Sequence, residues 1–475
     1  MKSVSRWFLL LSLLGAAVPI SLRQPAPTVL AIIHVTVIDV TGAGEEAAPD
    51  QTVIIKSDRI SSIGKTGEVP IPKGATTVDA TGKFLIPGLW DMHVHTLQEG
   101  RPEIFFPLFI ASGVTGVRDM GSPLGDFKGI TSLRERIEGG KLLGPRIIAA
   151  GPIVDGPSPM FPELSIAVAG ETEARQVVND LKSVGADFIK VYSLLNRDAY
   201  FAVADEAKRR DIPFAGHVPE SVSAAEASNA GQRSIEHLSG VRLACSTSET
   251  ELRTELLEAR ATSDASLLYR ALRHVYTKST ETYNEEKAEA LFARFVENET
   301  WQVPTLVVAR FLAKLNKSTN PAQTAAEASL KLTSDRENDP RLKGLTTDDL
   351  APLSESAQNA SDLVGAMRRA GVKFMAGTDA PNPFVIPGRS LHDELALLVQ
   401  AGFTPMEALQ SATRNPAIYL GKLDTLGTIE EGKVADLVLL DANPLGDITN
   451  TRKIWAVIIG GKIVPKTWLE EVSPN

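Results

Sequence analysis

Strand-like patterns mark both ends of the chain. "VLAIIHVTVIDV", from residue 29, and "TVIIKSDRISSIG", from residue 52, are rich in β-branched residues. "KVADLVLLD" and "KIWAVIIGGKIV" have the same character beyond residue 422, and the second carries a Gly460-Gly461 hairpin signal. Such runs predict short strands. Because each end alone has too few strands to bury a face, we expect residues 28–86 and 423–468 to form one small β-sandwich-like domain.

Between these ends the chain alternates strand-like and helix-like segments. Eight apolar runs stand out: GLWDMHVH, GVTGVRD, PRIIAAGP, DFIKVY, PFAGHV, RSIEHL, WQVPTLVV and VKFMAGTD. Helical periods separate most of them, as in EARQVVNDLKSVG and SDLVGAMRRAG. Alternating units predict a parallel sheet, and eight of them over residues 87–422 suit an α/β fold of the (β/α)₈ TIM barrel type. The alternative is an open doubly wound sheet, but no Gly-rich phosphate loop follows the first strand.

Composition indicates an ordinary folded protein with an N-terminal leader. The 475 residues are 43% apolar and 23% charged, with a net charge of −9 and one cysteine, Cys245, so an intrachain disulfide is excluded. Without a basic block, the chain is a poor partner for nucleic acid. Lys2 and Arg6 precede the apolar run WFLLLSLLGAAVPI. This predicts a signal peptide over about residues 1–22 and a secreted or periplasmic protein that leaves the membrane once the signal is removed. An uncleaved membrane anchor is the alternative.

The stretch GLWDMHVHT places His93 and His95 at the end of the first predicted barrel strand. Residues i and i+2 of a strand point to the same side, so both imidazoles are expected to face into the barrel. Each offers a nitrogen lone pair suited to Zn²⁺, although two hydrogen-bonded core histidines would give the same pattern. His217 and His237 close two later strands. Active sites of such barrels lie at the carboxyl ends of the strands, so all four histidines are candidate ligands.

The remaining three of the seven histidines are expected to have no role at this site. His34 lies in an N-terminal strand. His274 and His392 lie on charged, helix-like stretches, and we predict that both are surface residues.

Two further polar residues occur in predicted barrel strands. Lys190 lies inside DFIKVY, in a strand that a parallel barrel buries on both faces. An ammonium group there is costly unless it is paired, neutral or modified, and the alternative is a lysine that reaches solvent at the strand end. Asp379 closes AGTD. Its carboxylate could ligate a metal or carry a proton, or it could cap a helix instead.

Taken together, these runs resemble the motifs of the amidohydrolase superfamily. GLWDMHVHT resembles its first-strand metal motif, and DFIKVY, FAGH, IEH and AGTDAP resemble its later motifs in the same order. GFTPMEALQSATRNPAIYLG resembles the helix that closes the barrel, and LGTIEEGKVADLVLLDANPL resembles the return into the β-domain. The resemblance covers about residues 28–465. It is closest to the imidazolonepropionase-like and metal-dependent Xaa-Pro dipeptidase-like branch.

The resemblance implies a centre of two divalent metal ions, with zinc as the default for nitrogen ligands. The ligand positions of the superfamily correspond to His93, His95, Lys190, His217, His237 and Asp379. The first two histidines and the aspartate would hold the buried ion, and the other two histidines would hold the more exposed one. The lysine, carboxylated by CO₂, would bridge the two ions.

The implied activity is hydrolysis of a carbon–nitrogen amide bond by a metal-activated hydroxide. The substrate would be a small molecule, such as a dipeptide, an N-acyl amino acid or a cyclic amide. Asp379 would carry the proton to the leaving nitrogen. Tyr192 lies two residues after Lys190 and so shares its inward face, where it could bind substrate or simply pack at the barrel mouth.

Three alternatives remain open at this point. One is a mononuclear deaminase or imidazolonepropionase-like enzyme, because His217-x-x-Glu220 resembles the His/Glu pairing of some such members. Another is a lactonase or esterase that uses the same site, and the third is a non-catalytic exported scaffold. GPIVDGPSPMFPE lacks the histidine expected after the third strand of many dipeptidase-like relatives, which argues against specificity for proline dipeptides. The oligomeric state is left open.

Overall fold

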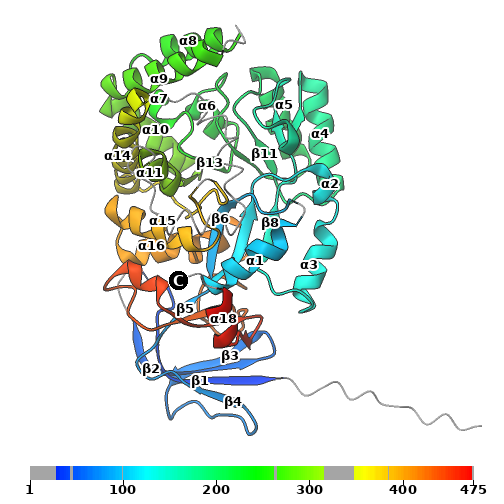
Figure 1. The fold of residues 1–475 in the computed structure, drawn as a ribbon, viewed down its shortest axis with the longest axis vertical. Helices are drawn as coiled ribbons and strands as arrows, with labels where there is room; N and C mark the ends of the chain where they lie inside the picture. Colours follow the sequence, from blue (N-terminus) through cyan, green and yellow to red (C-terminus); the bar gives the residue numbers. More distant parts are fainter. Residues whose placement is uncertain are drawn as a thin grey trace, which may run out of the picture.

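Six ranges of the chain are described by the computed structural model: residues 28–42, 47–98, 100–261, 265–314, 347–382 and 384–472. The predicted signal peptide, residues 1–22, lies outside them. Within these ranges, no helix combines the length and apolar character needed to cross a membrane. Figure 1 shows a barrel surrounded by helices, with a β-rich domain at its lower end.

Strands from both chain ends form the β-rich domain. They are β1 (Val29–Val37), β2 (Ala48–Lys56), β3 (Arg59–Lys65), β4 (Thr76–Asp79), β5 (Phe84–Pro87), β15 (Leu437–Leu440), β16 (Ile454–Ile459) and β17 (Lys462–Ile463). Their order is β17-β16-β15-β5-β1-β2-β3, and β4 also pairs with β1. The two ends meet where β5 and β15 pair antiparallel. The β-domain is thus one eight-stranded sheet.

Alternation along β15 explains how this sheet joins the barrel. Successive side chains of a strand point to opposite faces. Leu437 and Leu439 pack in the core of the β-domain, whereas Val438 and Leu440 pack in the large core shared with the barrel. All four residues are buried. The strand is apolar on both faces because it is sandwiched between two cores.

The apolar runs predicted the positions of the barrel strands. Seven of the eight positions are β6 (Leu89–Val94), β7 (Val114–Asp119), β8 (Arg146–Ala149) with its continuation β9 (Ile153–Asp155), β11 (Ile189–Val191), β12 (Phe214–Gly216), β13 (Ser234–Glu236) and β14 (Trp301–Val303), and β10 (Ser165–Ala167) pairs with β9; β9 and β10 lie outside the predicted runs. Residues 372–380 supply the eighth position. They join β14 through a parallel bridge from Gln302 to Phe374, and β6 through one from Val94 to Ala380. The (β/α)₈ barrel with a β-rich domain is confirmed.

The third position of the barrel is formed by two short strands. β8 pairs with β7, but after a bend the chain continues as β9, which pairs with β11 instead. Gly151 lies in the bend with φ of 74°, a conformation that glycine adopts without steric cost. The run PRIIAAGP therefore contains one strand, β8, as predicted, and the turn at Gly151 leads into a second short strand, β9, which was not predicted.

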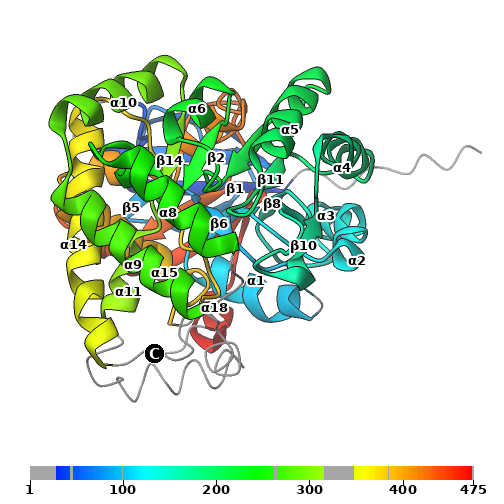
Figure 2. The ribbon, with the colours of Figure 1, turned by 90° about the horizontal axis from the view of Figure 1, so that it is seen from above.

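Helices cover the outside of the barrel (Figure 2). They are α1 (Arg101–Ala111), α2 (Leu124–Phe127), α3 (Ile130–Glu138), α4 (Glu171–Ser183), α5 (Arg197–Arg209), α6 (Ala224–Asn229), α7 (Val241–Ala244), α8 (Glu249–Ala261), α9 (Ala265–Glu281), α10 (Glu285–Glu297), α11 (Leu306–Lys314), α14 (Thr347–Arg369), α15 (Arg389–Gln400), α16 (Pro405–Ser411), α17 (Arg414–Tyr419) and α18 (Lys466–Val472). Local sequence sets their ends, as at α16, where Thr404 and Glu407 form a capping box. In Figure 1, α8 and α9 lie at the end of the barrel away from the β-domain.

Gly377 lets the eighth strand approach the first one closely. A Cβ atom at this position would lie 2.6 Å from Val303 Cγ1 and 2.8 Å from His93 Cβ, which is closer than packed atoms tolerate. The backbones are also joined directly, because Asp379 N donates to His93 O at 2.7 Å and His95 N donates to Ala380 O at 2.7 Å. The close approach sets Asp379 beside the two histidines of β6.

Candidate metal centre

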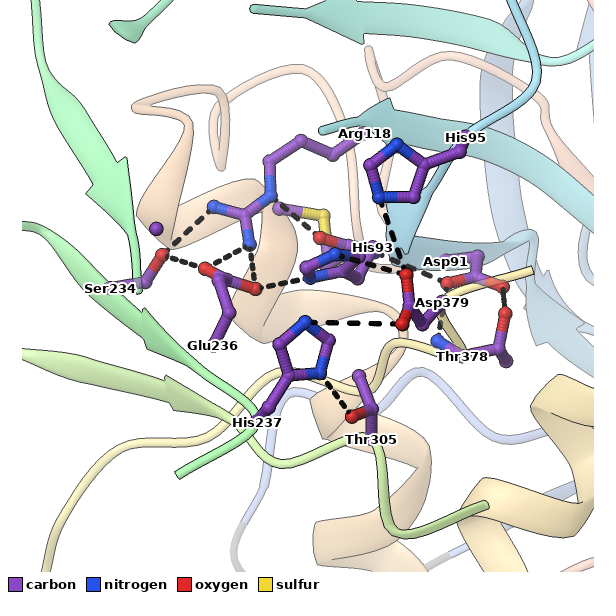
Figure 3. A network of polar contacts seen from close by, with 12 residues as sticks. Asp91, His93, His95, Arg118, Ser234, Glu236, His237, Thr305, Thr378 and Asp379 are labelled. Carbon is purple, nitrogen blue, oxygen red and sulfur yellow. Dashed lines mark hydrogen bonds and ion pairs between the residues drawn. The ribbon is translucent and has the colours of Figure 1, made fainter. Parts of the chain in front are cut away.

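Three predicted ligands meet at the carboxyl end of β6. His93 and His95 come from this strand and its end, and Asp379 comes from the end of the eighth strand (Figure 3). Asp379 Oδ1 lies 3.4 Å from His93 Nε2 and 3.3 Å from His95 Nε2. One ligand atom from each residue lies within 4.8 Å of the others. This spacing is compatible with a single metal ion between them.

The other predicted ligands surround the same point. His237, at the end of β13, has its ring centroid 4.5 Å from that of His93 and 4.9 Å from that of His217. Its Nε2 lies 4.0 Å from Asp379 Oδ2. Lys190 is fully buried in β11, which pairs with β12 just before His217. The barrel therefore places His237 and His217 beside the cluster of His93, His95 and Asp379, and Lys190 close enough to influence His93 electrostatically.

Each of the four imidazoles is held through Nδ1. The partners, in the order His93, His95, His217 and His237, are Glu236 Oε2 at 2.7 Å, Gly121 O at 3.0 Å, Ser193 Oγ at 2.9 Å and Thr305 Oγ1 at 2.7 Å. Metal-binding histidines are usually held in this way, because a partner on one nitrogen fixes the tautomer and directs the other nitrogen at the metal. The arrangement fits imidazoles that bind metal through Nε2.

Burial controls the charge of two of these groups. Burial, followed by the positive charge of Lys190, holds the pKa of His93 well below its ordinary value, so the ring is in the neutral form that binds a metal. Burial also lowers the pKa of Lys190 to about 8. The Lys190 Nζ has no hydrogen-bond partner among the residues that the structure describes. An amine with a pKa of about 8 is still largely protonated near pH 7, but its neutral form is far more populated than in an ordinary lysine, and a buried ammonium without a partner favours modification.

Two of the predicted ligands have an unusual backbone. His237 has φ of 57° and Asp379 has φ of 63°. Both values lie in the left-handed region, which residues other than glycine rarely adopt. Such residues persist where the surrounding structure holds them, and they cluster at functional sites. Both are at strand ends, where the turn aims the side chain over the barrel mouth.

Sequence reasoning missed a buried ion pair beneath the centre. Arg118, on β7, donates through Nη2 to both carboxylate oxygens of Glu236 at 2.9 and 3.0 Å, and Glu236 in turn holds His93 (Figure 3). Arg118 Nη1 also contacts Ser234 Oγ at 3.0 Å. Both charged side chains are fully buried. The signal was present, because each charge lies in an apolar strand, as Lys190 does.

Replacing Arg118 with methionine is expected to lower the free energy of unfolding by about 3–5 kcal/mol, because it leaves the Glu236 carboxylate buried without its ionic partner. The measurement is equilibrium urea unfolding of metal-free protein, so that lost metal binding does not contribute. Arg175→Met is the control. It breaks a partly exposed pair with Asp205 and should cost no more than about 1 kcal/mol. Equal losses in the two variants would show that the buried pair has no special role.

Tyr192 lies where the sequence placed it, beside the histidines. Its ring stacks on that of His217, with centroids 3.9 Å apart and planes at 30°. The Lys190 Nζ lies 5.6 Å from its ring centroid. Phe161 packs against it edge-on, with centroids 6.1 Å apart. Tyr192 is half-buried, so it forms part of the wall next to His217.

Two of the three other histidines are at the surface and one is not. His274 is exposed and pairs with Glu255, and His34 pairs with Asp50. The prediction that His392 is a surface residue is wrong. It is buried, with Nδ1 2.9 Å from Thr451 Oγ1 and Nε2 3.1 Å from Ser112 O, and burial lowers its pKa to about 4. Helix α15 packs between the barrel and residues 448–452, so Ser390, His392 and Glu394 are covered although the helix is rich in polar residues.

Glu220 does not approach the centre as a free carboxylate. Its two oxygens accept hydrogen bonds from Arg260 Nε at 2.7 Å and Nη2 at 2.6 Å. Arg260 lies on α8. Arg253, on the same helix, donates hydrogen bonds to the carbonyl oxygens of Glu220 and Val222. The carboxylate of the His217-x-x-Glu220 pattern is thus engaged in anchoring a helix.

Comparisons with known proteins identify the family of this chain. The model of the amidohydrolase family matches residues 84–464. A dihydroorotase of Geobacter metallireducens is 24% identical over 447 residues, which cover 87% of this chain and 95% of that protein. An imidazolonepropionase of Maricaulis maris is 41% identical over only 86 residues, 18% of this chain and 21% of that protein. A crystal structure of a Xaa-Pro dipeptidase with bound methionine has a TM-score of 0.65 and 23% identity, and the match covers 92% of this chain and 100% of that one.

The family match extends from β5, in the β-domain, to the strands near the C-terminus, and therefore includes the whole barrel. It supports a hydrolase that acts on carbon–nitrogen bonds. The resemblance inferred from the sequence motifs is confirmed. The chain belongs to the amidohydrolase family.

Proposed function

We propose that this protein is an exported binuclear metal hydrolase that cleaves an amide bond of a small substrate. The substrate class is a dipeptide, an N-acyl amino acid or a cyclic amide. Export rests on the N-terminal sequence pattern alone. The rest of the proposal is supported by the six side chains that converge at the carboxyl end of the barrel, as described above.

The observation that carries the proposal is the state of Lys190. Its side chain is fully buried, and its Nζ has no hydrogen bond within the described part of the chain. A lysine that served only to stabilise the fold would be expected to have a partner. Carboxylation by CO₂ would turn the amine into an anionic carbamate with two oxygen donors. Such a group would suit a place between two cations.

The donor set divides naturally into two positions. His93, His95 and Asp379 would hold the more buried ion, and His217 and His237 would hold the more exposed one, with carboxylated Lys190 between them. Zinc suits the nitrogen ligands. When bound, the ions would supply Lewis-acid chemistry, lowering the pKa of water and polarising a carbonyl oxygen.

The side chains of the protein have separate tasks in this scheme. Asp379 is 7% exposed and lies between the histidines of both positions. Its carboxylate is therefore well placed to accept a proton from water and to return it to the leaving nitrogen. Tyr192 stacks on His217 and so lies at the same side of the centre, where it would contact the substrate. Glu236, Gly121, Ser193 and Thr305 orient the imidazoles.

A substrate screen on zinc-reconstituted protein tests this proposal. Dipeptides, N-acyl amino acids and cyclic amides would be compared with esters, lactones and aminated purines, with release of amine or acid as the readout. We expect hydrolysis of at least one amide class, loss of activity with a chelator, and recovery with added zinc. Turnover of lactones or esters alone, or deamination by protein that holds one ion, would contradict the proposed function and favour the corresponding alternative.

A further inference from the structure

Glu394 has a buried carboxyl group that lies outside the set of proposed ligands, and burial raises its pKa to about 8. It is on α15, its side chain is fully buried, and its Oε1 and Oε2 accept the backbone N–H groups of Leu306 at 3.0 Å and Val307 at 2.7 Å. These are the first two residues of α11. The first amides of a helix have no partner within the helix, and a buried carboxyl group is costly unless its oxygens are hydrogen-bonded. The two hydrogen bonds therefore satisfy both the helix amides and the buried oxygens of Glu394.

The residue just before these amides, Thr305, has a strained backbone. It is buried, with φ of 47°. A positive φ is a clear outlier for a β-branched residue, and it persists only when the surroundings hold it. Because Glu394 binds the amides of the next two residues, it fixes the turn in which Thr305 sits.

Thr305 in turn holds His237. Its Oγ1 lies 2.7 Å from His237 Nδ1 (Figure 3). If His237 binds a metal through Nε2, the proton of the neutral ring is on Nδ1 and is donated to Thr305 Oγ1. The second histidine of the exposed position, His217, is held separately by Ser193. The contacts that begin at Glu394 on α15 therefore lead through Thr305 to His237, whereas His217 is held by Ser193.

We propose that Glu394 is a positioning residue for the exposed metal position, acting through the Thr305 turn on the imidazole of His237. This inference rests on the proposed function, since it assumes that His237 binds the second ion. Glu394 touches neither substrate nor metal. Its effect is on the affinity for the second ion, whereas the position formed by His93, His95 and Asp379 keeps its affinity.

The test is zinc titration of metal-free protein against a competing chelator, which gives the affinity of each ion without an activity assay. Glu394→Gln places an amide NH₂ opposite one of the two backbone donors, and Thr305→Val removes the hydroxyl at nearly constant volume. Each substitution is expected to lower the affinity for the second zinc ion by about 10- to 100-fold, as is typical for residues that support a metal ligand. If Glu394 and Thr305 act through the same chain of contacts, the double variant should bind the second zinc ion with no lower affinity than the single variant that has the lower affinity.

Glu206→Gln is the control, because Glu206 is a buried glutamate on another barrel helix, α5, where Asn179 and Arg210 contact it. Its zinc affinities should match the wild type. Should E394Q not fold, Glu394→Asp, which keeps the carboxylate but shortens its reach, is judged by the same criteria. Wild-type affinity for the second ion in the Glu394 variant, or multiplicative losses in the double variant, would overturn the inference. A wild-type protein that binds fewer than two ions would instead refute the proposed function.

Discussion

Asparagine in place of Asp379 is expected to lower kcat/KM for an amide substrate by about 10²–10⁴-fold, the usual contribution of a positioned proton carrier. The change keeps the volume of the side chain but removes the charge and the basic oxygen. Asp379 Oδ1 lies 3.3–3.4 Å from the Nε2 atoms of His93 and His95, so the affinity for the buried ion should fall as well. Steady-state kinetics at saturating zinc separates the two effects, because only the catalytic loss then remains.

Asp79→Asn is the matched control for this experiment. Asp79 lies at the end of β4 in the β-domain, where its carboxylate accepts hydrogen bonds from Thr81. The same change of charge there should leave kcat/KM unaltered. If D379N retained wild-type turnover on every substrate that the wild type hydrolyses, the catalytic assignment of Asp379 would be wrong.

Lys190→Ala is expected to remove the bridge between the two metal positions. We predict that the variant retains one zinc ion in place of two, and that its activity falls by more than the roughly 100-fold that loss of a residue supporting a ligand can cost. The reason is that the buried amine, once carboxylated, would contact both ions. With ¹³C-labelled bicarbonate, NMR should detect a carbamate carbon in the wild type and none in the variant.

Reconstitution without bicarbonate gives an independent view of the same residue. Metal-free wild-type protein should take up the second ion more slowly when CO₂ is excluded, whereas Lys190→Ala should show no dependence on bicarbonate. Lys182→Ala, on the outer helix α4, controls for general effects of removing a lysine. Full uptake of two ions by K190A, with or without bicarbonate, would rule out a bridging carbamate.

The barrel and its candidate ligands were predictable because each strand has a recognisable local sequence. An apolar run that contains Lys or ends in His or Asp is short enough to identify directly, and in a parallel barrel all strands end on the same side. His93, His217 and Asp379 are far apart in the sequence, yet this rule alone brings them together. The same rule could have identified Arg118 and Glu236, which are charged residues inside apolar strands.

The supporting contacts were not predictable from the sequence. Gly121 supports His95 through a backbone carbonyl, and Thr305 supports His237 through a hydroxyl on a strained turn. Neither has a sequence pattern of its own, because the contact depends on how two loops approach each other. His392 was misjudged for a related reason. Its charged neighbours indicated a surface helix, but α15 is covered on a second side by residues 448–452.

The measurement that tests the central claim most directly is the zinc content of the reconstituted wild-type protein, followed during titration together with amide hydrolysis. The six converging side chains predict two equivalents of zinc per chain, with hydrolysis rising as the second equivalent binds. A single equivalent that supports full activity and is unaffected by Lys190→Ala would contradict the binuclear centre.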